Sequence, residues 1–142
     1  MNTDKLLDKI IRRQTDLYDT VYFYGDSTAA AQTVDKLLAR YTARKPKANI
    51  LRTDAESFRW QTLEMLLTGD TAMPDCDLYI FERLEKIAGL ETNERRLYGI
   101  LDHLLENRRQ IVICGAAPTA QMENLAPRVR AQVDGAIALH LG

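Results

Sequence analysis

The sequence has few cysteines and no metal-binding spacing. Its two cysteines, Cys76 and Cys114, lie far apart without a CxxC pattern, so we expect neither a disulfide framework nor a thiolate metal site. His103 and His140 are its two histidines, and neither belongs to a ligand pattern such as HExxH. We therefore expect no metal site and a reducing, intracellular environment.

The sequence also lacks long apolar runs and a nucleophile motif. No stretch approaches the roughly 20 apolar residues that span a membrane, and the charged, amphipathic N-terminus is unlike a secretory signal. Ser27 and Ser57 are the only serines, and neither lies in a GxSxG elbow. These absences predict a soluble, cytoplasmic protein with no membrane partner and no nucleophilic catalysis.

The chain has no strong charge of either sign. Its 19 Lys and Arg residues against 20 Asp and Glu residues give a net charge of −1. A nearly neutral chain has no overall field to attract a polyanion, so contact with nucleic acid would depend on a local basic patch. The length of 142 residues fits one domain with its own core.

Apolar periodicity predicts an alternation of helices and strands. Five apolar residues recur at helical spacing and predict an N-terminal helix over 4–18: Leu6, Leu7, Ile10, Ile11 and Leu17. Short apolar runs predict five strands, at 21–24, 49–53, 78–81, 111–114 and 136–141. Strands that alternate with helices form parallel sheets covered on both faces. We predict a single α/β domain over 1–142, with a three-layer core and a five-stranded parallel sheet from about residue 20.

Ligands of such sheets bind beyond the carboxyl ends of the strands. This rule selects segments 25–33, 82–89 and 115–118, together with 125–133 just before the last strand. We therefore expect the functional residues to lie in these four segments.

These segments also carry a family pattern. The most specific stretches are Asp77-Leu78-Tyr79-Ile80-Phe81-Glu82, Ala88-Gly89-Leu90-Glu91 and Gln110-Ile111-Val112-Ile113. In this order they resemble the AAA+ domain of the bacterial replication initiator DnaA and related loader proteins, over about 21–139. The resemblance implies a P-loop NTPase fold with a Walker B strand before a short turn. Because the sequence ends at its fifth predicted strand, we expect the AAA+ base without the helical lid or the DNA-binding helix-turn-helix domain.

The resemblance places the phosphate-binding loop at 25–32, where its chemistry is missing. Such a loop needs glycines, a lysine for the phosphates and a hydroxyl for magnesium. Here Gly25 is kept, but the other required positions hold Ala30, Ala31 and Gln32, and Asp26 adds a negative charge. We therefore expect no bound cofactor. The alternative interpretation is an ordinary strand-to-helix turn capped by Ser27 or Thr28.

The other nucleotide positions implied by the resemblance are altered as well. Glu82-Arg83 stands where Walker B has an acidic pair, and a cation such as Arg83 cannot act as a base. The sensor 1 position at 114–117 has no polar group for a γ-phosphate, and neutral Gln132 stands at the arginine-finger position. We expect no catalytic residue. An alternative interpretation of Glu82, Arg83, Glu85 and Lys86 is a solvated, mutually paired surface.

Six residues are candidate contacts for a partner protein or nucleic acid: Trp60, Arg44, Lys45, Lys47, Arg128 and Arg130. Trp60 is either an exposed anchor of an interface or an ordinary helix residue, since burial of Phe58 alone would satisfy its helix. The basic loop is either a phosphate contact, with Tyr41 available to stack on a base, or a solvated loop.

The leading functional prediction is a non-catalytic pseudo-AAA+ module. It would bind a protein, either a replication protein or a second copy of itself, and act in replication initiation or its regulation. One alternative is a domain that binds single-stranded nucleic acid through the basic loop. Another is a residual nucleotide-binding protein or a slow ATPase.

Overall fold

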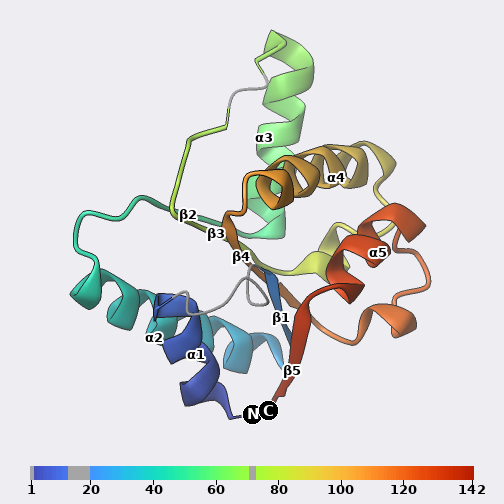
Figure 1. Ribbon diagram of the computed structural model, residues 1–142. Helices are drawn as coiled ribbons and strands as arrows, with labels where there is room; N and C mark the ends of the chain where they lie inside the picture. The colour runs from blue at the N-terminus through green and yellow to red at the C-terminus, as the bar shows by residue number, and fades with distance from the viewer. Residues whose placement is uncertain (1, 13–19, 71–72) are drawn as a thin grey trace.

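The computed structural model describes residues 2–12, 20–70 and 73–142 (Figure 1). Its strands are β1 (Thr20–Gly25), β2 (Ile50–Thr53), β3 (Leu78–Phe81), β4 (Gln110–Gly115) and β5 (Ile137–Leu141). Its α-helices are α1 (Thr3–Arg12), α2 (Ser27–Arg44), α3 (Ala55–Thr68), α4 (Glu91–Glu106) and α5 (Pro127–Asp134). Two short 3-10 helices, η2 (Leu84–Lys86) and η3 (Thr119–Gln121), follow β3 and β4. None of the helices described is long and apolar enough to cross a membrane.

The strands form one parallel sheet in the order β2-β3-β4-β1-β5. The central strands have no polar face because both of their faces are covered, as expected for short runs of Val, Ile, Tyr and Phe. In register, Val21 of β1 lies between Val112 of β4 and Ile137 of β5. The predicted α/β fold with a five-stranded parallel sheet is therefore confirmed.

Helices cover the two faces of the sheet in separate layers (Figure 1). On one face, α1 and α2 pack with side chains of β1, β3 and β4, among them Phe23, Ile80 and Val112. On the other face, α3, α4 and α5 pack around side chains that include Tyr22, Tyr79 and Ile111. This arrangement is the predicted three-layer sandwich. In the described ranges no helical subdomain follows β5.

The N-terminal helix agrees with the prediction over the residues that the structure describes. The prediction covered 4–18, whereas α1 ends at Arg12 and residues 13–19 lie outside the described residues. Its predicted apolar face is buried, because Leu6, Leu7 and Ile10 have no exposed surface. Asp4 forms ion pairs with Lys36 and Arg40 of α2, which lower the pKa of its carboxyl group.

One helix was not predicted. The segment before the last strand was expected to carry functional residues, and it forms α5, whose buried side chains are Val129 and Val133. The helix has eight residues, too few for a clear period, but Pro127 occupies its first turn, where proline is favoured.

Candidate functional site

Three of the four segments at the carboxyl edge of the sheet meet, as the sequence predicts. One small hollow is lined by residues from the ends of β1, β3 and β4: Gly25, Ser27, Ala30, Glu82, Arg83, Glu85, Cys114, Gly115 and Ala116. The space that they enclose is ≈ 20 Å³. That volume is enough for about one water molecule. The hollow at the candidate phosphate site is therefore small.

The turn between β1 and α2 holds the candidate phosphate-binding segment. The α-helix begins at Ser27, directly after Gly25 and Asp26, so most of segment 25–32 is helical and no extended loop precedes the helix. Asp26 is the N-cap: its Oδ2 accepts the Ala29 N–H at 3.0 Å. The carbonyl oxygen of Asp26 accepts the Ala30 N–H at 2.9 Å. The prediction of an ordinary capped turn describes this geometry, but Ser27 or Thr28 as the capping residue was wrong.

Three positions of this segment differ from a phosphate-binding loop. Ala30 lines the hollow with an apolar side chain, whereas Ala31 and Gln32 are not part of its lining. Ala30 is buried, Ala31 is half-buried and Gln32 is exposed, and these residues form the second turn of α2. The segment holds no cationic side chain. Its donors for an anion are all neutral: the hydroxyls of Ser27 and Thr28 and the backbone N–H groups at the start of α2, of which the Asp26 carboxylate already engages that of Ala29.

The backbone at Gly25 has no room for a side chain because β5 lies close to it. Its φ of +132° lies in a region that L side chains rarely adopt, and an added Cβ atom would lie 2.0 Å from the carbonyl oxygen of Leu141. The single glycine shared with a phosphate-binding loop is therefore required here by the close approach of β5.

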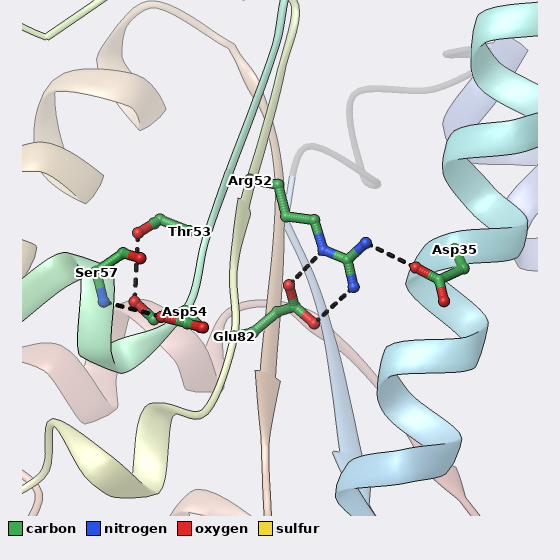
Figure 2. A network of polar contacts seen from close by, with 6 residues as sticks. All are labelled: Asp35, Arg52, Thr53, Asp54, Ser57 and Glu82. Carbon is green, nitrogen blue, oxygen red and sulfur yellow. Dashed lines mark hydrogen bonds and ion pairs between the residues drawn. The ribbon is translucent and has the colours of Figure 1, made fainter.

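Glu82 at the end of β3 is held by a cation from the neighbouring strand (Figure 2). Arg52 of β2 donates from Nε to Glu82 Oε1 at 2.5 Å and from Nη2 to Oε2 at 3.1 Å. Its Nη1 donates to Asp35 Oδ1 of α2 at 2.7 Å. The side chain of Glu82 is 11% exposed and that of Arg52 is 33% exposed. These hydrogen bonds raise the pKa of the Arg52 guanidinium above its usual value. Both carboxylate oxygens of the Walker B position are thus engaged within the protein.

The interpretation of residues 82–86 as a mutually paired surface is only partly right. Arg83 Nε donates to Glu85 Oε2 at 3.0 Å, which is the expected local pair. Glu82, however, pairs with Arg52, and Lys86 has no ion-pair partner among the described residues. Arg83 has a φ of +67°, an uncommon conformation for a residue with a side chain, at the turn into η2.

The sensor 1 position is apolar and tightly packed. Burial raises the pKa of the Cys114 thiol to about 12. An added Cβ atom at Gly115 would lie 2.1 Å from the hydroxyl oxygen of Tyr22. That hydroxyl donates to the Ala117 carbonyl oxygen at 2.6 Å. The hydroxyl is thus committed to the backbone of the segment after β4.

The side chains at the arginine-finger position bind within the domain. Gln132 donates from Nε2 to the Tyr98 carbonyl oxygen at 3.0 Å. Arg130, a candidate contact, is half-buried and donates to the Met122 carbonyl oxygen at 2.7 Å. Arg128 is exposed, and its guanidinium lies 4.7 Å from the ring centroid of Tyr98. Of this pair, Arg128 is the exposed residue.

A buried carboxylate that the sequence analysis missed joins the same elements. Glu94 of α4 is 6% exposed. Its Oε1 accepts the Gly89 N–H at 3.1 Å and its Oε2 accepts the Ala126 N–H at 2.5 Å. Glu94 therefore anchors the turn before α4 to the start of α5. Its position four residues after Leu90, in the first turn of a helix, was the available signal.

The basic residues at the end of α2 and in the loop after it are accessible, but the aromatic ring beside them is buried. Arg44 and Lys47 are exposed, and Lys45 is half-buried with its Nζ 5.0 Å from the ring centroid of Tyr41. Tyr41 is 1% exposed. The expectation that Tyr41 could stack on a base is therefore wrong, because helix packing buries its ring.

Among the described residues, the most exposed large apolar side chains lie on α3, and the exposure of Trp60 is consistent with both interpretations given above. Trp60 is 62% exposed, while Phe58 is buried at 3%. Leu63, Leu66 and Leu67 are also exposed, at 44%, 62% and 78%. In Figure 1 the C-terminal part of α3 projects beyond α4. These leucines are regular features of a helical pattern, and nothing in that pattern indicates that they face solvent.

Comparisons with known proteins agree with this geometry. The sequence model of the family described as "Bacterial DnaA ATPAse domain" matches residues 6–140. The chromosomal replication initiator protein DnaA of Mesorhizobium japonicum is 26% identical over 110 residues, which are 74% of this chain and 22% of that protein. The chain thus spans about a fifth of the curated relatives that it matches.

Two solved structures share the fold at low identity. Domain III of the Thermotoga maritima replication initiation protein DnaA matches with a TM-score of 0.85 and 14% identity, over 99% of this chain and 60% of that one. A replication initiator DnaA bound to AMPPCP and single-stranded DNA matches with a TM-score of 0.82 and 14% identity, over 96% of this chain and 44% of that one. The family match over nearly the whole sequence and the shared fold lead to one conclusion. This chain belongs to the bacterial DnaA ATPase-domain family.

Proposed function

We propose that this chain is a DnaA-type module that binds another protein and does not use nucleotide. The observation that carries the proposal is the Arg52–Glu82 pair. A Walker B carboxylate must be free to face a hydrated magnesium ion, whereas both oxygens of Glu82 accept hydrogen bonds from the Arg52 guanidinium. A metal ion would have to displace a bidentate, charge-assisted contact.

The start of α2 supports the same proposal. Phosphate binding at a helix N-terminus relies on free backbone N–H groups and a favourable dipole. Here the Asp26 carboxylate accepts from Ala29 and places a negative charge where a phosphate would approach. No lysine in segment 25–32 is available to offset the charge of a triphosphate. An anion at this position would meet repulsion from Asp26 and no cation of this segment.

Hydrolysis would lack its usual groups even if nucleotide bound. Arg83, which follows Glu82, is a cation paired with Glu85 and cannot accept a proton from water. The neutral Gln132 amide donates within its own domain and carries no charge for a neighbouring site. These arrangements favour a non-catalytic role over a slow ATPase.

The family membership supports a link to replication initiation. The curated relatives are chromosomal replication initiators, although the chain spans only about a fifth of their length. A domain that keeps the fold of these proteins without their nucleotide chemistry retains surfaces for protein contact. We therefore propose a replication protein or a second copy of this chain as partner, in the cytoplasm.

Sedimentation velocity in nucleotide-free buffer tests the proposal. The chain is run alone and with purified full-length DnaA from the same organism, and we expect either self-association or a complex. A chain that stays monomeric and forms no complex contradicts the binding role. ATP hydrolysis by the chain above that of a Glu82→Ala variant contradicts the non-catalytic role.

A further inference from the structure

The exposed face of α3 borders an open groove. Its walls come from α3, η2 and the start of α4, and its volume is ≈ 710 Å³. The apolar lining is contributed mainly by Trp60, Leu63 and Leu66 of α3. Trp60 and Leu66 each leave 62% of their surface exposed. A helix with such residues facing solvent has an apolar surface that burial against a partner would stabilise.

The walls of the groove are fixed by a contact between α3 and α4. Arg96 of α4 donates from Nη1 to the Phe58 carbonyl oxygen and to Thr62 Oγ1, each at 3.1 Å. Its guanidinium lies 4.4 Å from the ring centroid of Phe58. Because these contacts hold the first half of α3 against α4, the groove is present before any partner arrives, which lowers the ordering cost of binding.

The groove is lined by two carboxylates, Asp54 and Glu56, and by three cations, Arg59, Arg83 and Lys86. Asp54 and Glu56 lie at the N-terminus of α3, where the helix dipole compensates carboxylates, and Asp54 caps the helix by accepting the Ser57 N–H at 2.9 Å. Among the described residues, neither Arg59 nor Lys86 has an ion-pair partner. Arg59 and Lys86 are therefore lining cations that can pair with carboxylates of a partner.

One wall also holds an unsatisfied acceptor. Oδ1 of Asn93, in the first turn of α4, is buried and accepts no hydrogen bond among the described residues. A buried amide oxygen without a donor is costly.

We propose that this groove receives an amphipathic helix of a partner protein whose apolar face is flanked by carboxylates. The inference rests on the proposed protein-binding function and names its surface and the chemistry of its partner. Apolar side chains spaced at i, i+3, i+4 and i+7 would cover Trp60, Leu63 and Leu66, while acidic side chains would face Arg59 and Lys86. The leucines favour a helix over a nucleic-acid strand, because a phosphate backbone gains nothing from burying them.

Trp60 is the only tryptophan of the chain, so its fluorescence reports on this groove alone. The probe is a synthetic helical peptide of about 15 residues, about four turns, with leucines on one face and glutamates elsewhere. A matched peptide carries lysine in place of each glutamate. We expect the acidic peptide to shift the Trp60 emission to shorter wavelength with saturation, and the lysine peptide to bind about tenfold more weakly.

Variants locate the binding. The double variant Arg59→Glu/Lys86→Glu should lose about tenfold in affinity for the acidic peptide. The variant Leu63→Glu should lose the shift. The matched control is Leu105→Glu, a partly exposed leucine of α4 outside the groove lining, which should bind like the unaltered chain. Far-UV circular dichroism checks that each variant is folded.

Four outcomes would overturn the inference: no response to the acidic peptide, equal binding of both peptides, a saturable response to an oligo(dT) strand instead, or a shift that depends only on the concentration of the chain. The last two would assign the groove to single-stranded DNA or to a second copy. If Leu63→Glu still sediments with DnaA, the groove inference fails while the proposed protein-binding function stands.

Discussion

The guanidinium of Arg52 donates hydrogen bonds to both carboxylate oxygens of Glu82, at 2.5 and 3.1 Å. Arg52 lies on β2, which is parallel to β3, the strand that Glu82 follows. The third contact of Arg52, to Asp35, ties this pair to α2 on one face of the sheet (Figure 2). A cation supplied by the fold thus pairs with the carboxylate at the proposed Walker B position.

Removal of the cation alone should destabilise the fold. The variant Arg52→Leu leaves the mostly buried Glu82 without a partner, and we expect a loss of about 1 to 2 kcal/mol in the free energy of unfolding. This loss is smaller than that for a fully buried ion pair because Arg52 is partly exposed to solvent. Urea denaturation measures it.

The matched controls separate this effect from a general loss of charge. The double variant Arg52→Leu/Glu82→Leu should recover part of the loss, because no unpaired carboxylate remains. Arg95→Leu removes a largely exposed pair with Glu91 and should change stability by less than about 0.5 kcal/mol. An equal loss of unfolding free energy in Arg52→Leu and Arg95→Leu would show that the Arg52–Glu82 pair contributes no more than an exposed pair.

The cap of α2 can be tested one residue at a time. Asp26→Ala removes the acceptor of the Ala29 N–H and should cost about 1 kcal/mol in the free energy of unfolding. Ser27→Ala is the matched control. Because Ser27 is exposed and makes no capping bond, its removal should cost only a few tenths of a kcal/mol. A larger loss in Ser27→Ala than in Asp26→Ala would refute the assignment of the cap.

Two glycines should respond in opposite directions to alanine. Gly25→Ala combines a positive φ with a clash against the Leu141 backbone, so we expect a loss of about 2 kcal/mol or more. Gly99 lies in α4 with no atom within 4 Å of an added Cβ atom, and Gly99→Ala should stabilise by about 0.5 to 1 kcal/mol. Thermal unfolding of both variants decides, and a tolerated Gly25→Ala would contradict the close approach of β5.

Stability should fall at alkaline pH in part through Cys114. Below its ordinary pKa of 9.0 the thiol is protonated in the folded and unfolded chain, so its contribution is complete. Burial raises the folded pKa to about 12. Between these values the unfolded chain loses the proton and the folded chain keeps it, so the free energy of unfolding decreases as pH rises. In urea titrations above pH 9, Cys114→Ala should lose stability less steeply than the unaltered chain. Equal slopes would contradict the buried thiol.

The fold could be predicted because its signals are local. Each central strand is a short run of Val, Ile, Tyr or Phe between helical patterns, and burial on both faces requires that composition. The cap of α2 was misplaced by one or two residues, since Asp26, Ser27 and Thr28 are all good capping residues and only geometry distinguishes them. The helix α5 was missed because eight residues give no clear period.

The site could be predicted less completely because its decisive contact is distant in the sequence. Arg52 and Glu82 lie 30 residues apart, and their pairing depends on the β2–β3 register, in which Thr53 lies opposite Phe81. The exposure of Leu66 and Leu67 depends on how far α3 extends past α4. Neither relationship leaves a periodic signal in the sequence.

Calorimetric titration with Mg-ATP tests the central claim most directly. Nucleotide at millimolar concentration is titrated into the purified chain, with the thermal unfolding midpoint measured in parallel. We predict no saturable heat and no rise in the midpoint, because a ligand stabilises only a state that it binds. A true ligand at 100 times its dissociation constant would raise the free energy of unfolding by about 2.7 kcal/mol. Saturable binding together with a rise in the unfolding midpoint would contradict the account.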